Sequence, residues 1–264
     1  MIRSPLGLRL NPGRPIREQI REAATIGAKG VVIDAVGDLS PERLSETGRR
    51  EIRYMLRSVE LLLIAVNLPT RRPFDTVAQL EDRLRRAETA FSMSFELGAP
   101  LVLARIGELP AEADALRRET WISALRELSR RADHRGVRFC LETGTEPGES
   151  LRPLLDGLDT IGVAASIDPA ALLLRGIDPI ETTRALGPWD AHAYAADGAS
   201  SGGSLIAPPR QGARAGFPPR SLDWEEYLGA LEEIEYRGFL TIWPDPTLEA
   251  GPRFTALANR LRNL

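Results

Sequence analysis

VRFCLETG, residues 137–144, is an apolar run that ends on the carboxylate Glu142 and then breaks at Gly144. An apolar run of this length between turn residues is typical of a strand buried on both faces of a parallel sheet. A charged residue at the C-terminal end of such a strand fits an active-site position in a parallel α/β protein. On this strand alone, a glutamate that simply faces water is the better explanation. The interpretation therefore depends on how the other strands end.

The rest of the chain repeats this pattern of a short apolar run followed by an amphipathic segment. Strands are expected at residues 6–10, 30–35, 61–67, 101–106, 137–144, 161–167, 190–196 and 239–243. Helices are expected at about 15–26, 40–59, 77–97, 112–135, 150–158, 179–186, 224–236 and 252–262, the second capped by Ser40 with Pro41 at its first position. Eight such units without a composition break predict one domain over residues 1–264, a single (β/α)8 TIM barrel of the α/β class.

Composition narrows the classes of partner and chemistry. The 264 residues are 43% hydrophobic with a formal net charge of -3, which gives no general attraction to nucleic acid or to an anionic membrane. We see no signal peptide and no long apolar run, so we expect a cytoplasmic protein with no membrane partner. Cys140 is the only cysteine, which excludes an intrachain disulfide and a cysteine zinc cluster. Lys29 is the only lysine, so Schiff-base chemistry would depend on it.

The ends of the predicted strands carry polar and aromatic side chains. In a TIM barrel these ends and the loops after them form one face, where ligands bind. The sequence therefore predicts a polar pocket with at least three acids and two arginines, and no particular reaction. The residues at these positions are Arg9, Asp34, Asn67, Arg105, Glu142, Asp168, His192, Tyr194, Trp243 and Asp245.

Four short segments make the chain resemble the xylose isomerase-like TIM barrels, which include sugar-phosphate isomerases, ketose epimerases and endonuclease IV enzymes. The segments are residues 141–144 (LETG), 166–169 (SIDP), 192–197 (HAYAAD), and 222–224 (LDW) with 238–243 (GFLTIW). The resemblance spans essentially the whole chain. It implies a small polyhydroxylated substrate and no nucleotide cofactor. Endonuclease activity fits poorly, because that branch needs a histidine-rich site and this chain has two histidines.

The resemblance also implies a divalent cation, Mn²⁺, Mg²⁺, Co²⁺ or Zn²⁺, with Glu142 and Asp168 as ligands. The strand-seven histidine ligand of the family falls on Tyr194, and the strand-eight glutamate ligand falls on Trp243. A third family histidine, three residues after the strand-six Asp, is Ala171 here. Half of the ligand set is missing, and this favours a chain that binds no such ion over one that does.

His192 and Asp245 lie two residues from the vacant ligand positions and could face the same side of their strands. Two residues along a strand span about 6.6 Å, whereas divalent ions hold their ligands at about 2.0–2.5 Å. His192 is therefore a ligand only if strand seven is irregular, and is otherwise a satisfied core histidine. The loop over residues 198–221 carries Arg214 between Arg210 and Arg220, either to bind a phosphate or carboxylate or simply as a solvated segment.

Two functions remain open from the sequence. The first is a sugar or sugar-phosphate isomerase or epimerase, in which Glu142 is a ligand or base and Asp168 a ligand. The second is a non-catalytic or metal-free barrel that binds a sugar-like ligand, with Tyr194 and Trp243 as a stacking surface. Glu142 and Asp168 could also form a structural ion-pair network with Arg9 or Arg105. The expected substrate-binding residues are Arg9, Asn67, Arg105, His192, Tyr194, Arg214 and Trp243. Formation of a homo-oligomer stays open.

Overall fold

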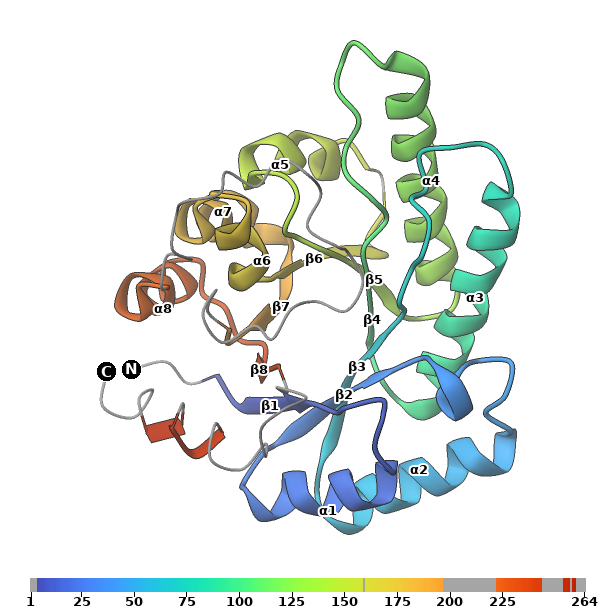
Figure 1. The fold of residues 1–264 in the computed structure, drawn as a ribbon, viewed down its shortest axis with the longest axis vertical. Coiled ribbons are helices and arrows are strands. Elements are labelled where there is room, and N and C mark those ends of the chain that lie inside the picture. Colours follow the sequence, from blue (N-terminus) through green and yellow to red (C-terminus); the bar gives the residue numbers. More distant parts are fainter. Residues whose placement is uncertain (1–3, 159, 197–221, 244–253, 257, 260–264) are drawn as a thin grey trace.

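The structure is a computed structural model that describes residues 4–158, 160–196, 222–243, 254–256 and 258–259. Eight parallel strands form a closed barrel in which each strand pairs with the next and β8 pairs with β1 (Figure 1). The (β/α)8 barrel predicted from the sequence is thereby confirmed. The strands are β1 (Leu6–Arg9), β2 (Gly30–Asp34), β3 (Leu62–Asn67), β4 (Leu101–Ala104), β5 (Arg138–Glu142), β6 (Val163–Ile167), β7 (Asp190–Tyr194) and β8 (Leu240–Ile242).

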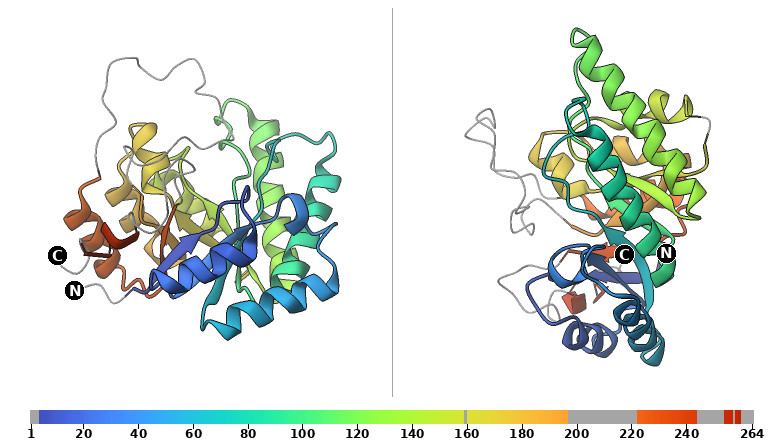
Figure 2. Two further views of the ribbon diagram at one scale, coloured as in Figure 1. Left: turned by 60° about the horizontal axis from the view of Figure 1, so that its bottom comes forward. Right: turned by 90° about the vertical axis from the view of Figure 1, so that its right-hand side faces the viewer.

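Helices surround the barrel, and the side view in Figure 2 shows them packed along its outside. They are α1 (Ile16–Thr25), α2 (Glu46–Ser58), α3 (Leu80–Leu97), α4 (Ala115–His134), α5 (Gly148–Asp156), α6 (Pro169–Leu174), α7 (Pro179–Leu186) and α8 (Trp224–Glu233), with 3₁₀ turns at Gly37–Leu39 and Gly187–Trp189. Residues 254–256 and 258–259 are also helical. The larger apolar cluster lies between these helices and the outward side chains of the strands.

A second, smaller apolar cluster consists mostly of strand residues and fills the barrel interior. Because side chains alternate along a strand, residues two apart point the same way. Cys140 belongs to the interior cluster, so Glu142 at the end of β5 also faces the barrel axis. By the same alternation, Asp34 on β2 faces the same way as Val32, which belongs to the interior cluster. Tyr194 at the end of β7 is itself a member of that cluster. The barrel interior is thus polar at the C-terminal end of the strands and apolar toward their N-terminal end.

Three helix starts and one short helix differ from the sequence predictions, and one of these starts is that of α4, at Ala115 and not at about residue 112. The predicted cap at Ser40 is wrong: α2 begins at Glu46, because the Ser45 side chain accepts the hydrogen bond from the Gly48 N–H. The third helix begins at Leu80 and not at Val77, since Gln79 has the left-handed φ of 56°. α6 was not expected; Asp168 caps it and Pro169 is its first residue.

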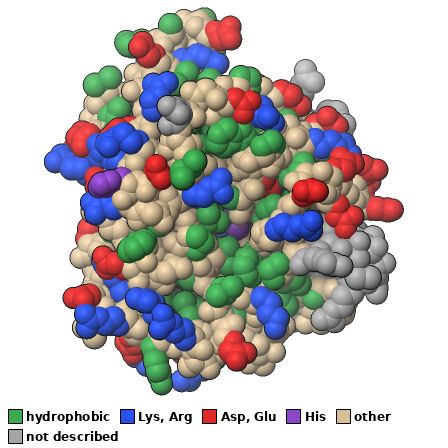
Figure 3. All heavy atoms as spheres, turned by 180° about the vertical axis from the view of Figure 1, so that it is seen from behind, with side chains coloured by type: hydrophobic (Ala, Val, Ile, Leu, Met, Phe, Trp, Pro, Cys, Tyr) green, Lys and Arg blue, Asp and Glu red, His purple; other side chains and the backbone are tan. Residues whose placement is uncertain are grey.

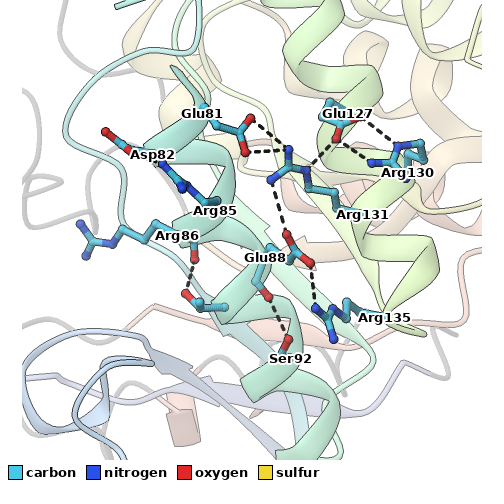
Figure 4. Close-up of polar contacts among 11 residues, drawn as sticks. Glu81, Asp82, Arg85, Arg86, Glu88, Ser92, Glu127, Arg130, Arg131 and Arg135 are labelled. Carbon is cyan, nitrogen blue, oxygen red and sulfur yellow. Dashed lines mark hydrogen bonds and ion pairs between the residues drawn. The ribbon is translucent and has the colours of Figure 1, made fainter. Parts of the chain in front are cut away.

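Arginine side chains form ion pairs within and between the helices of the outer layer. Arg131 on α4 contacts Glu127 on its own helix and Glu81 and Glu88 on α3, at 2.7, 3.1 and 3.4 Å (Figure 4). Hydrogen bonds from Arg130 and then Arg131 lower the pKa of Glu127 to about 2. On the face seen in Figure 3, acidic and basic side chains are interspersed, both along the edge and nearer the middle. Among the described residues, no helix combines the length and apolarity needed to cross a membrane.

Candidate functional site

The polar side chains predicted to lie at the strand ends are brought together at one end of the barrel. Each of them is the last residue of its strand or follows within one residue. Hydrogen bonds, ion pairs and one ring contact connect them into a single network. Its members are Arg9, Asp34, Asn67, Arg105, Glu142, Asp168, Tyr194 and Trp243.

Arg9 lies at the centre of this network and is only 4% exposed. Its Nε and Nη2 donate to the two oxygens of Asp34 at 2.9 and 3.1 Å, a bidentate pair. Asn67 Nδ2 donates to the same Asp34 Oδ1 at 3.1 Å. The Arg9 guanidinium carbon lies 3.7 Å from the ring centroid of Trp243. Arg9 is thus fixed by a carboxylate on one side and an indole face on the other.

Tyr194 connects Arg9 to Glu142. Arg9 Nη1 donates to the Tyr194 hydroxyl at 3.1 Å, and this hydroxyl donates to Glu142 Oε1 at 3.0 Å. Burial, and then the charge of Glu142, raise the pKa of Tyr194 well above its ordinary value, so the phenol keeps the proton that it donates. One oxygen of Glu142 is therefore held by a neutral donor, and the Arg9 cation lies 4.0 Å away.

Arg105 connects Glu142, at the end of β5, to Asp168, the residue just after β6. Its Nη2 donates to Asp168 Oδ2 at 2.6 Å, and its Nε lies 3.8 Å from Glu142 Oε2. Asp168 Oδ1 accepts the N–H of Ala171 at 3.1 Å as the cap of α6, and the Asp168 N–H donates to Thr143 Oγ1. Burial raises the pKa of Asp168, and the Arg105 guanidinium opposes that rise. Both oxygens of Asp168 thus accept hydrogen bonds within the chain.

Several polar side-chain atoms of the site have no hydrogen bond within the described part of the chain, and two of them matter for binding a ligand. One is Glu142 Oε2, which lies 3.8 Å from Arg105 Nε. The other is Nη1 of Arg105, a side chain that is 34% exposed and so reaches the surface of the site. An acceptor and a cationic donor therefore lie side by side with capacity for a ligand.

His192 lies one layer deeper than this network. Its Nδ1 is 2.8 Å from Ser166 Oγ and its Nε2 is 2.9 Å from Thr241 Oγ1, so both ring nitrogens have hydroxyl partners. Its ring packs edge-on against Tyr194 with centroids 4.6 Å apart. Burial, and then the charge of Arg9, lower the pKa of His192 to about 3, so the ring is neutral near pH 7. This is the environment of a core histidine.

Sequence reasoning missed the hydroxyl residues that support the site. Thr143 accepts from the Asp168 backbone, and the Tyr227 hydroxyl donates to the Tyr194 carbonyl at 3.1 Å. Thr143 could have been noticed because it directly follows Glu142 and precedes Gly144, whose φ is 135°. Three residues named from the sequence, Asp197, Arg214 and Asp245, lie outside the described residues, as do Arg210 and Arg220.

A family model described as xylose isomerase-like TIM barrel matches residues 20–263. No curated protein matches the chain. Among solved structures, a xylose isomerase domain protein from Planctomyces limnophilus is 19% identical with a TM-score of 0.77, over 98% of this chain and 95% of that one. A D-psicose 3-epimerase crystallised with D-fructose is 13% identical with a TM-score of 0.73, over 95% and 89% of the two chains. A 3-keto-D-glucoside 4-epimerase from E. coli is 14% identical with a TM-score of 0.74, over 99% and 100%.

Proposed function

The chain belongs to the xylose isomerase-like TIM barrel family, and from this premise we propose that it is an isomerase or epimerase of a sugar or sugar phosphate. The substrate would be a small polyhydroxylated carbonyl compound bound at the C-terminal end of the barrel. Solved structures of the same fold include a D-psicose 3-epimerase and a 3-keto-D-glucoside 4-epimerase. The reaction class, and not either substrate, is proposed for this chain.

The observation that supports the proposal most strongly is the pairing of Glu142 Oε2 with Arg105. Moving a proton at a carbon beside a carbonyl requires a base for the C–H and a donor for the oxygen that becomes negative. Glu142 Oε2 has no hydrogen bond within the described residues, and the nearest nitrogen of Arg105 is 3.8 Å away. A base and a cationic donor are thus adjacent, as this chemistry needs.

The proposed reaction begins when Glu142 Oε2 accepts the proton from the carbon next to the substrate carbonyl. The C–H electron pair forms a carbon–carbon double bond while the carbonyl electrons move onto oxygen. The Arg105 N–H groups donate hydrogen bonds to that oxygen, which stabilises the enediolate. For the isomer, the hydroxyl proton on the neighbouring carbon passes to the former carbonyl oxygen, Glu142 returns its proton to the former carbonyl carbon, and the new carbonyl forms on the neighbouring carbon. For the epimer, water gives a proton to the opposite face of the same carbon, the carbonyl re-forms, and Glu142 releases its proton to water.

The other acids would keep the pair in place. Asp168 holds Arg105 through a 2.6 Å ion pair, so the guanidinium stays beside Glu142. Tyr194 holds the other oxygen of Glu142, which leaves Oε2 directed to the ligand. We therefore assign proton transfer to Glu142, substrate oxygen binding to Arg105, and positioning to Asp168 and Tyr194.

In the alternative function, a barrel that binds a sugar without converting it, Tyr194 and Trp243 would form the surface on which the sugar ring stacks. Tyr194 is 0% exposed. The Arg9 guanidinium, 3.7 Å from the Trp243 centroid, covers one face of that indole. These contacts weigh against a stacking platform and favour the enzyme.

The proposal is tested by incubating the full chain with a panel of aldoses, ketoses and their phosphates and identifying products by chromatography. Conversion of at least one sugar into its isomer or epimer is expected. Glu142→Gln, which keeps the shape but removes the base, should lower the rate by about 10²–10⁴-fold. His134→Gln, at the exposed end of α4, should retain the wild-type rate.

Turnover that survives in Glu142→Gln would contradict the assignment of Glu142 as the base. Conversion of no sugar by a wild-type chain whose circular dichroism shows it folded would contradict the reaction class. Binding of a sugar without conversion would then support the ligand-binding alternative.

A further inference from the structure

The acids of the strand-end site are already matched by cations that belong to the chain. Three carboxylates, Asp34, Glu142 and Asp168, lie in one network with Arg9 and Arg105. The side chains of Arg9 and the three acids are each less than 10% exposed. Buried carboxylates in this arrangement would otherwise need an ion from solution, because burial of unpaired like charges is costly.

The oxygens of these acids are largely committed to other partners. Both oxygens of Asp34 accept from Arg9, and both oxygens of Asp168 accept hydrogen bonds, one from Arg105 and one from the backbone of Ala171. Glu142 Oε1 accepts from Tyr194. Among the six oxygens of these three acids, only Glu142 Oε2 lacks a hydrogen bond from a described residue. A divalent ion in a catalytic site takes about three protein ligands, so one free oxygen does not fit it.

Among the described residues, the other side chains considered as metal ligands or at a ligand position are also occupied. The two ring nitrogens of His192 lie against the hydroxyls of Ser166 and Thr241. The indole of Trp243 lies over the Arg9 guanidinium at the end of β8. Across residues 4–158, 160–196, 222–243 and the described positions beyond, no group of three or more histidine, cysteine or acidic side chains is arranged to hold a metal ion.

We propose that Arg9 and Arg105 are the resident cations of this site, in the place of the divalent ion that the fold family implies, and that the chain works without a metal. Arg105 is the substrate-facing cation, since it is the more exposed of the two and has an Nη1 without a partner among the described residues. Arg9 is the buried cation, which balances Asp34 and Glu142 and does not reach the substrate.

Arginine suits this role for physical reasons. Its guanidinium stays protonated at any working pH, and its planar fork binds a carboxylate through two parallel hydrogen bonds. Burial alone would lower the pKa of Arg9, but Tyr194, Asp34 and Glu142 together reverse that effect and raise it. A lysine at position 9 could keep the charge but could not pair in the same bidentate way.

The first test is thermal unfolding of the full chain, stripped with a chelator and titrated with Mn²⁺, Co²⁺, Mg²⁺ and Zn²⁺. We expect no saturable shift of the melting temperature in the wild type. The double variant Arg9→Met with Arg105→Met leaves the three acids without a cation. If it folds, it should gain a shift of about 5 to 10 °C at about 100 times the dissociation constant of the best ion.

Arg9→Lys is the conservative variant and should gain no metal response, because it keeps the charge. Arg126→Met, at an exposed position on α4, is the matched control and should behave as the wild type. A saturable wild-type shift that disappears in Glu142→Gln would overturn the inference. A folded double variant that responds to no ion would also overturn it. If the double variant does not fold, the wild-type titration decides.

This inference concerns the same site as the proposed function, but its test does not depend on turnover. A metal-dependent shift in the wild type would overturn the resident-cation account and leave the isomerase proposal standing. Failure of the sugar panel would have the opposite effect. The two experiments therefore fail separately.

Discussion

Tyr194 is the buried side chain that links the Arg9 guanidinium to the Glu142 carboxylate. Its hydroxyl accepts from Arg9 and donates to Glu142, and its side chain has no exposed surface. The ring fills the top of the barrel against His192 and lies 5.1 Å from Trp243 between centroids. Packing and hydrogen bonding thus come from different atoms of one residue and can be separated by mutation.

Tyr194→Phe should keep the packing and remove the hydrogen bonds. We expect a loss of about 1 to 3 kcal/mol in the free energy of unfolding, since an Arg9 N–H and Glu142 Oε1 are left without this partner. Urea unfolding measures the change. Tyr54→Phe, on a side chain that is 73% exposed, is the control and should be neutral. A Tyr194→Phe variant as stable as the wild type would show that the hydroxyl contributes little.

His192 predicts a pH dependence of stability. Its pKa is about 3 in the folded chain and about 6.5 when unfolded, so below pH 6.5 the unfolded chain binds the proton more readily. The stability due to neutral His192 is complete above the unfolded pKa and is lost as the pH falls toward 3. Between pH 7 and pH 5 the loss should be about 2 kcal/mol from this group.

The measurement is urea unfolding of wild type and His192→Gln at pH 7 and pH 5. The variant should be less sensitive to this change of pH than the wild type, whatever its absolute stability. His134→Gln removes the other histidine, which is exposed, and should retain the wild-type difference. Equal pH sensitivity in wild type and His192→Gln would contradict the buried neutral histidine.

At the residue scale, the strand-end positions of the candidate residues were predictable and their partners were not. Strand alternation and the C-terminal ends of strands were sufficient to select Glu142 and Asp168. From the sequence alone, either Arg9 or Arg105 could be the partner of these two acids. Arg9 instead forms its bidentate pair with Asp34, because partner choice depends on side-chain rotamers and distances across the barrel.

At the scale of elements, the strands were predicted more accurately than the helix ends. An apolar run buried on both faces is visible in the sequence, whereas several residues near a helix start can cap it. Ser40 and Ser45 both have the right chemistry, and only Ser45 reaches a helical N–H, that of Gly48. α6 was missed even though Asp168 and Pro169 are a good start signal, since six residues give little periodicity.

Two glycines test how closely the elements pack. A Cβ at Gly162, just before β6, would lie 2.1 Å from the carbonyl oxygen of Ser129 on α4. Gly162→Ala should therefore destabilise the fold by about 2 to 3 kcal/mol, because the backbone of α4 or β6 must move.

Gly229, inside α8, has nothing within 4 Å of such a Cβ. Gly229→Ala should stabilise by about 0.5 to 1 kcal/mol, since alanine favours a helix.

Thermal or urea unfolding of the two alanine variants beside the wild type measures both effects. They carry the same change at a tight and an open position, so each serves as the control for the other. A stable Gly162→Ala protein would mean that α4 and β6 lie farther apart than the structure has them.

At the scale of the whole molecule, the barrel was predictable because eight strand and helix units follow one another without interruption. Function was less accessible, since the same barrel supports many reactions. The family could be inferred from short segments such as LETG and SIDP, and the family model over residues 20–263 confirms it. The network of Arg9 and Arg105 required the three-dimensional arrangement, because its members come from strands far apart in the sequence.

The central claim is that Glu142 moves a substrate proton while the chain's own arginines supply the positive charge. It is tested most directly by the rate of conversion of a sugar substrate in excess chelator and again after adding Mn²⁺, Co²⁺, Mg²⁺ or Zn²⁺. The account predicts the same rate in both conditions, and a loss of about 10²–10⁴-fold in Glu142→Gln in both. A rate that the chelator abolishes and one of these ions restores would contradict it.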